Sequence, residues 1–192
     1  STTSAVISAQ AVRAARILSE AARELGRTED LAIYEADIHE LSAALNQHSW
    51  DADAGYYSYV RHDGEGQPVG FFRDADGVNY NMGLDGAHPL TAGVCDAEQE
   101  ATLIERLFDP ERLWTDVGLT TVDQSAPYYR SDGYWNGTVW FPHQWFFWKT
   151  MLDLGRSAHA YQIARQALDT WKREVDESYL CFEHFPVESG RG

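Results

Sequence analysis

The sequence has few of the basic residues that nucleic-acid and phosphate sites need. Only 15 of its 192 residues are lysine or arginine, against 30 aspartates and glutamates, so the formal net charge is −15. Binding to phosphate groups needs a cluster of basic side chains, and none is present, which excludes nucleic acid and an anionic membrane surface as expected partners. A neutral ligand such as a carbohydrate is compatible with this charge.

Other signals are also missing. The two cysteines, Cys95 and Cys181, lack metal-binding spacing and would form a disulfide only if the fold brings them together, so the compartment stays undetermined. The seven histidines form no HExxH motif, and there is neither a glycine-rich phosphate loop nor a GxSxG elbow. We therefore expect no metal and no cofactor. No apolar run reaches the ~20 residues of a membrane span.

Aromatic residues, by contrast, are abundant at 13%, and four of the seven tryptophans lie between Tyr134 and Gly155. Pro142 suits the first turn of a helix and Gly155 its end, and the residues between them are apolar on nearly every side, which predicts a buried helix. The preceding loop, residues 131–138, predicts a carbohydrate platform, because sugar C–H faces pack on aromatic rings. The alternative is a core helix with an ordinary entry loop.

Apolar residues recur at helical spacing in several further segments. Asp96 is a good cap for a helix over residues 97–108, and Thr28 for a helix that follows a turn at Gly26. The expected helices cover residues 2–25, 28 to about 45, 97–108, 142–154 and from about 157. A small hairpin is expected between Tyr57 and Phe72. The sequence thus predicts an all-α fold of antiparallel helical hairpins, with the candidate site in long aromatic-rich connections.

Two of these helices have a defined expected core face. The predicted stripe of the first helix, whose candidate caps are Thr2, Thr3 and Ser4, consists of Ile7, Ala14, Ile17, Leu18, Ala21 and Leu25. The predicted stripe of the second helix consists of Tyr34, Ile38, Leu41 and Leu45.

Glu183 is the first candidate for acid/base chemistry. It follows an apolar run at residues 179–182 that favours a β-strand, and aromatic residues surround it in sequence. An enclosed carboxylate suits general acid/base work, whereas the alternative is a surface glutamate on a C-terminal strand. His184 either orients a substrate hydroxyl or caps a loop. Weaker acidic candidates, which more often have turn roles, are Asp51, Asp53, Asp85, Asp132 and Glu188.

Four stretches, in the same order, resemble the α-glycosidases with (α/α)6 barrels. Residues 134–155 are similar to the segment "YWRGPVW…GL…G" of these enzymes, and residues 50–57 to "W…GYY". GLDGAHPL and the helix after it resemble "PL…G" followed by "L.dP..fwt..GL", and FEHFPVESGRG resembles "yE.y.p.tG.g". The best match is glycoside hydrolase family 63, the α-glucosidase and mannosylglycerate hydrolase group, and trehalases are more distant.

The resemblance implies hydrolysis of an α-linked glucoside-like sugar with inversion, and Glu183 matches the general base. The positions that it implies for substrate binding are Trp50, Tyr57, Trp135, Asn136, Gly137 and Trp140, with His184 as a further candidate beside the base. The chain departs from the family pattern at two positions, where Asn136 replaces an arginine and Thr138 a proline.

The family's general acid lies upstream of the first helix, so we expect it outside this chain. Residues 1–192 are then expected to be the C-terminal part of one catalytic domain and about half of the (α/α)6 toroid, partnered by the N-terminal part or by a second copy. Two alternatives remain open. One is a sugar epimerase or isomerase of the same architecture that uses histidines as proton carriers, and the other is a non-catalytic fragment.

Overall fold

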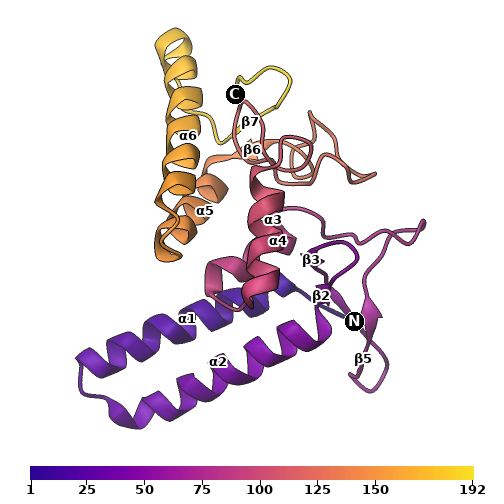
Figure 1. Ribbon diagram of the computed structural model, residues 1–192, viewed down its shortest axis with the longest axis vertical. Helices are drawn as coiled ribbons and strands as arrows, with labels where there is room; N and C mark the ends of the chain where they lie inside the picture. Colours follow the sequence, from indigo (N-terminus) through magenta and orange to yellow (C-terminus); the bar gives the residue numbers. More distant parts are fainter. The chain divides into compact units, whose positions relative to one another are not determined.

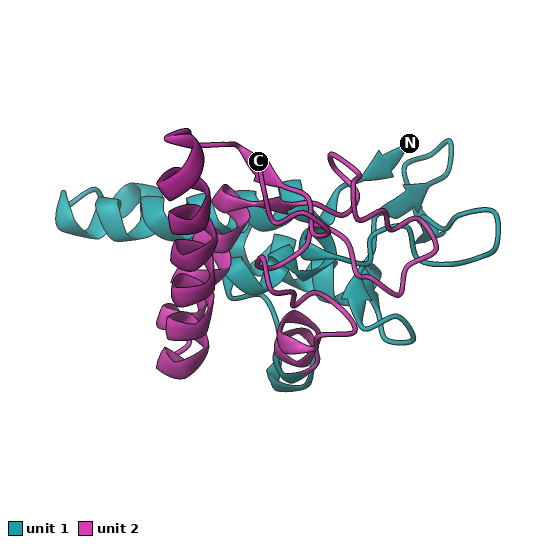
Figure 2. Cartoon of the chain, turned by 90° about the horizontal axis from the view of Figure 1, so that it is seen from above, with its two compact units in different colours: residues 1–101 teal, residues 102–192 magenta.

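The computed structural model describes residues 1–192 and divides into two compact units, Ser1–Ala101 and Thr102–Gly192, coloured separately in Figure 2. The boundary falls within helix α4, Ala97–Phe108. Each unit contains one antiparallel hairpin of long helices together with short strands (Figure 1). The predicted organisation in helical hairpins is therefore confirmed.

The hairpin of the first unit consists of α1, Ala5–Glu24, and α2, Thr28–His48. Of the three proposed caps of α1, Ser4 is the one used, because its hydroxyl accepts a hydrogen bond from the backbone of Ile7 at 3.4 Å. Gly26 adopts a positive φ of 70° in the turn. The prediction that Thr28 caps α2 is wrong, since Thr28 is already helical and the cap position is Arg27.

The buried face of α1 also differs from the prediction. All six residues of the expected stripe are exposed, and Ile7 and Leu25 reach exposed fractions of 69% and 75%. The face that packs consists mostly of small residues, namely Ala5, Ala9, Val12, Ala15, Ser19 and Ala22. Small side chains let neighbouring backbones approach closely, so the larger apolar residues lie on the opposite face. The stripe of α2 is confirmed in direction, because Leu45 is buried and Tyr34, Ile38 and Leu41 are half-buried.

Two small antiparallel sheets complete the first unit. Strands β4, Val60–His62, and β5, Pro68–Phe71, form the predicted hairpin, and β1, Thr2–Thr3, adds a third strand beside β4. Strand β2, Trp50–Asp51, pairs with β3, Tyr56–Tyr57. The short helix α3, Leu84–Ala87, and the 3₁₀ helix η1, His88–Ala92, then lead towards α4.

Helix α4 begins with the predicted cap. The Asp96 carboxylate accepts hydrogen bonds from the backbone N–H groups of Glu98 and Gln99, both at 2.9 Å. The Gln99 side chain in turn accepts from the backbone N–H of Asp96 at 2.9 Å, which completes a reciprocal capping box. These bonds satisfy N–H groups that the first helical turn would otherwise leave unpaired.

The hairpin of the second unit consists of α5, Phe141–Asp153, and α6, Ser157–Ser178. Pro142 lies in the first turn of α5 and Gly155 has a positive φ of 69° after it, both as predicted. The predicted burial of α5 is only partial within this chain, because Trp145 and Leu152 are 52% and 44% exposed. On its buried face, Gln144 exchanges two 2.9 Å hydrogen bonds with the backbone of Leu119.

A short strand pair links the entry of α5 to the end of the chain. Strand β6, Val139–Trp140, pairs with β7, His184–Phe185, and a core cluster of Val117, Val139 and Phe185 lies beneath it. The expected strand at residues 179–182 is absent, since Tyr179 takes a left-handed conformation with φ 59° and ends α6. None of the helices has both the length and the apolar character needed to cross a bilayer.

Candidate functional site

The β6–β7 pairing brings the aromatic loop at residues 131–138 beside the segment that carries Glu183. Trp140 lies opposite His184 in the register, and Val139 opposite Phe185. Because these positions are far apart in the sequence, the juxtaposition is a product of the tertiary fold. It unites most of the predicted site residues within the second unit.

Four rings contact one another in a group that we call the aromatic cluster: Tyr134, Trp135, Trp140 and His184. Trp135 lies almost parallel to Trp140, with centroids 4.2 Å apart and planes at 8°, and His184 stacks on Trp140 at 5.2 Å and 22°. Trp140 is nearly buried, whereas Trp135 is 64% exposed. A flat exposed ring backed by a second ring is the kind of surface that packs against the C–H face of a sugar.

Glu183 lies at the edge of this cluster, where its Oε2 accepts a 2.9 Å hydrogen bond from the phenol of Tyr134. This bond raises the pKa of Tyr134 above its ordinary value, because ionisation of the phenol would lose the bond and place two negative charges together. Glu183 is exposed, so the prediction that its aromatic neighbours in sequence enclose it is wrong. Phe182 and Phe185 instead pack into the core beneath β6 and β7.

The loop that presents the cluster is fixed by its own hydrogen bonds. The Asn136 side chain donates to the carbonyl of Tyr128, and the Asn136 carbonyl accepts from the backbone of Arg130, both at 2.9 Å. Gly137 is buried at a point where a Cβ atom would lie only 1.8 Å from the Arg130 carbonyl oxygen. Asn136 and Gly137 thus shape the loop, and the Asn136 amide is directed into the loop.

Thr138 and Trp140 tie the loop to the start of α5. The indole N–H of Trp140 and the hydroxyl of Thr138 both donate to the carbonyl oxygen of Tyr134 at 2.8 Å. Thr138 is fully buried, so its hydroxyl needs this partner. The backbone of Tyr134 is consequently held at the point from which its ring reaches Glu183.

Two further acids of the second unit have different partners. Glu188 accepts a 2.5 Å hydrogen bond from the hydroxyl of Ser131, and burial together with the charge of Glu188 raises the pKa of Tyr129. Asp132 is exposed and lies 3.5 Å from Arg130. Neither carboxylate has the contact with the aromatic cluster that distinguishes Glu183.

The remaining candidates lie in the first unit. Asp51 is buried and pairs with Arg73 at 2.9 Å, which is a structural role, and Asp53 is exposed. Asp85 accepts from the phenol of Tyr59 at 3.2 Å, and burial followed by the charge of Asp85 raises the pKa of Tyr59 to about 12.

Trp50 and Tyr57 form an edge-to-face pair with centroids 5.0 Å apart. Tyr57 is fully buried, and its phenol lies 2.7 Å from the Asn46 side chain and 2.8 Å from that of Gln99. Burial raises the pKa of Cys95, beside this phenol, to about 12. These contacts give Tyr57 a core role in this unit, and its contact with a sugar stays a prediction.

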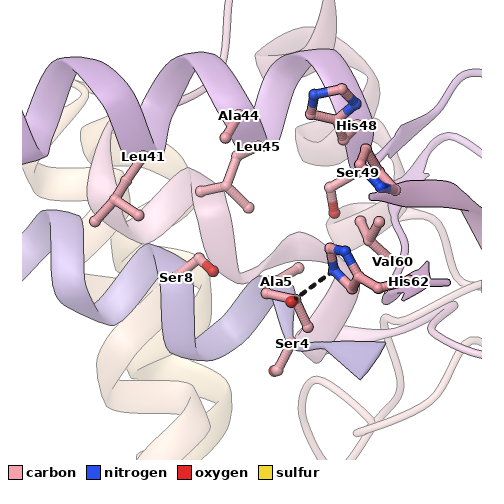
Figure 3. A pocket seen from close by; sticks show the side chains of 12 residues that line it. Ser4, Ala5, Ser8, Leu41, Ala44, Leu45, His48, Ser49, Val60 and His62 are labelled. Carbon is pink, nitrogen blue, oxygen red and sulfur yellow. Dashed lines mark hydrogen bonds between the residues drawn. The ribbon is translucent and has the colours of Figure 1, made fainter. Parts of the chain in front are cut away.

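The first unit also contains a small cavity of about 160 Å³ between α1, α2 and β4 (Figure 3). Leu45 and Val60 contribute apolar walls, and His62 hydrogen-bonds Thr3 at 2.8 Å at one end. No carboxylate and none of the predicted site residues line it. Neither cysteine forms a disulfide, and no group of three histidine, cysteine or acidic side chains is placed to hold a metal ion.

The family assignment follows from the sequence as a whole. Residues 1–190 match the model of the mannosylglycerate hydrolase MGH1-like glycoside hydrolase domain. The chain belongs to this family. A mannosylglycerate hydrolase of Rubrobacter radiotolerans is 27% identical over 183 residues, which cover 94% of this chain and 37% of that protein. The resemblance read from the four motifs is thereby confirmed.

Solved structures agree on the fold of this MGH1-like domain. The GH63 mannosylglycerate hydrolase of Thermus thermophilus in complex with glucose superposes with a TM-score of 0.78 at 24% identity, over all of this chain and 41% of that one. The neutral trehalase of Saccharomyces cerevisiae gives a TM-score of 0.75 at 15% identity, over 97% and 34%. Both relatives have (α/α)6-barrel folds, and the chain spans about two fifths of the GH63 protein.

Proposed function

We propose that this MGH1-like domain acts in glycoside hydrolysis and contributes the general base, Glu183. The observation that carries the proposal is the hydrogen bond of the exposed Glu183 carboxylate to Tyr134, beside a stacked and partly exposed indole pair. Such a pair offers a sugar ring an apolar face, with a carboxylate at its edge to receive a proton. Two of the relatives named above are called mannosylglycerate hydrolases, which favours the same class of reaction.

In the proposed inverting reaction, Glu183 removes a proton from a water molecule as its oxygen bonds to the anomeric carbon. The glycosidic C–O bond breaks on the opposite face, and a second carboxylic acid protonates the departing oxygen. The two carboxyl groups of an inverting enzyme lie about 6.5–9.5 Å apart, so that the water fits between them. We place the acid outside this chain, in a part corresponding to the remaining length of the relatives.

The proposal predicts which anomer of the sugar is released first. The complete natural protein is incubated with mannosylglycerate and with α-glucosides, and the released sugar is followed by proton NMR in the first minutes. We expect one of these substrates to release its sugar initially as the β-anomer. Initial release of the α-anomer would contradict inversion, and transfer of solvent deuterium to a sugar carbon without bond cleavage would favour the epimerase alternative.

We further propose that another part of the same barrel, in a longer chain or a second copy, covers the exposed apolar surfaces. One is the face of α1 with Ile7, Leu18 and Leu25, and another is a groove of about 460 Å³ between α5 and α6, partly lined by Trp145 and Trp171. Such patches usually mark surfaces that another element covers.

The corresponding measurement is the mass of the natural polypeptide and of its assembly in solution. We expect at least one of the two to exceed 21.7 kDa, the mass of this chain. A natural protein of that mass that remains a monomer would exclude the covering part. It would also move the non-catalytic alternative to first place, because the general acid would have no source.

A further inference from the structure

The hydrogen bond between Tyr134 and Glu183 has a direct chemical consequence for the base. Tyr134 donates to Oε2, and no other group hydrogen-bonds the Glu183 side chain. The second oxygen, Oε1, is therefore available to a water molecule. A base needs one oxygen directed at the water whose proton it takes, and a donor on the other oxygen fixes the rotation of the carboxylate.

Tyr134 is itself held firmly, which is what a positioning group requires. Its ring makes edge contacts with Trp135, Trp140 and His184, with centroid separations of 5.0, 4.8 and 4.7 Å. Its carbonyl oxygen accepts the hydrogen bonds from Thr138 and Trp140 described above. Tyr134 and Glu183 are both exposed, but the Glu183 side chain has only this one hydrogen bond and lies in a bend just before β7. The better-anchored partner of the pair is Tyr134.

We propose that Tyr134 is the positioning residue of the general base: it holds the Glu183 carboxylate against the aromatic cluster and leaves Oε1 to receive the proton of the attacking water. The inference rests on the proposed function for the role of Glu183. Tyr134 acts through Glu183 and contacts no reacting atom itself. The same ring packs edge-on against the indoles, so Tyr134 connects the base directly to the aromatic cluster.

The first test is spectroscopic and does not depend on activity. The complete protein is labelled with ¹³Cζ-tyrosine, the Tyr134 signal is assigned by its loss in Tyr134→Phe, and its titration is followed at high pH. In the wild type we expect a pKa above the ordinary value of 10.0, because the phenol donates to Glu183. In Glu183→Gln the midpoint should fall, since the charge is removed.

The second test is kinetic. Tyr134→Phe keeps the ring and removes the hydroxyl, so we expect kcat to fall about tenfold with little change in KM, as for the loss of one hydrogen bond to a charged group. Tyr179→Phe is the matched control, since Tyr179 is 86% exposed and should leave both unchanged.

The outcomes separate the two proposals. An unchanged Tyr134 midpoint in Glu183→Gln overturns the positioning role, whatever the activity. An unchanged kcat in Tyr134→Phe overturns it too. Near-normal turnover of Glu183→Gln, with the Tyr134 midpoint lowered, overturns the proposed function of Glu183 while leaving the hydrogen bond intact.

Discussion

Replacement of Glu183 by glutamine is expected to reduce kcat of the complete protein by about 10²- to 10⁴-fold, the range typical for loss of a general base. The amide keeps the shape of the side chain and can still accept the hydrogen bond of Tyr134, but it cannot take a proton from water. Because Glu183 lies at the edge of the aromatic cluster and the indoles remain in place, KM should change little. Steady-state kinetics on the substrate identified by product analysis measures both.

The matched control is Glu188→Gln. Glu188 is an exposed acid of the same unit that binds Ser131 and has no contact with the aromatic cluster, so the loss in kcat should stay within a few-fold. If Glu188→Gln abolished turnover and Glu183→Gln did not, the base would be assigned to the wrong carboxylate. A large rise in KM with unchanged kcat for Glu183→Gln would instead give Glu183 a binding role.

Local signals in the sequence predicted the helices well where a capping residue or a stop residue was present. Asp96 forms the expected cap of α4, and Pro142 and Gly155 lie at the two ends of α5. These features depend on residues within a few positions of one another, which is the range that sequence patterns cover. The predicted cap at Thr28 was wrong by one position, because α2 begins at Thr28 itself and no side chain caps it.

Burial was harder to predict, because hydrophobic periodicity identifies an apolar face but not its neighbour. On α1 the close contact is made by alanines, while Ile7 and Leu25 lie on the exposed face. On α5 the same reasoning predicted a buried helix, yet Trp145 is half exposed in this chain. Large exposed apolar residues are expected where another segment packs on them. The pattern of residues along this chain does not show where such a segment lies.

The candidate site shows the same difference between local features, which the sequence predicts, and long-range contacts, which it does not. The motif resemblance pointed to Glu183, Trp135 and Trp140, and His184 was a candidate because it stands beside Glu183. The structure brings these four together through the β6–β7 pair. Tyr134 was not singled out, although it stands next to Trp135, because its importance comes from a hydrogen bond to a residue 49 positions later. Long-range pairing of this kind has no local pattern that would have identified it.

Gly137→Ala is expected to destabilise the second unit by about 2–4 kcal/mol, and to lower activity through the loop that presents the aromatic cluster. An added Cβ would lie 1.8 Å from the carbonyl oxygen and 2.6 Å from the carbonyl carbon of Arg130. These are backbone atoms, so no side-chain rotation relieves the overlap. The chain must shift, and the nearest bond to be lost is the one from Arg130 N–H to the Asn136 carbonyl, now 2.9 Å.

Urea denaturation followed by circular dichroism measures the loss of stability, with kcat/KM as the readout of the site. Gly64→Ala is the control, because a Cβ at Gly64 would meet nothing within 4 Å, and its effect should stay within about 0.5 kcal/mol. If Gly137→Ala were as stable and active as Gly64→Ala, the close approach to Arg130 would not constrain the loop. If instead activity fell with stability unchanged, the strain would be confined to the loop, and the orientation of Trp135, Trp140 and Tyr134 would matter more for function than for folding.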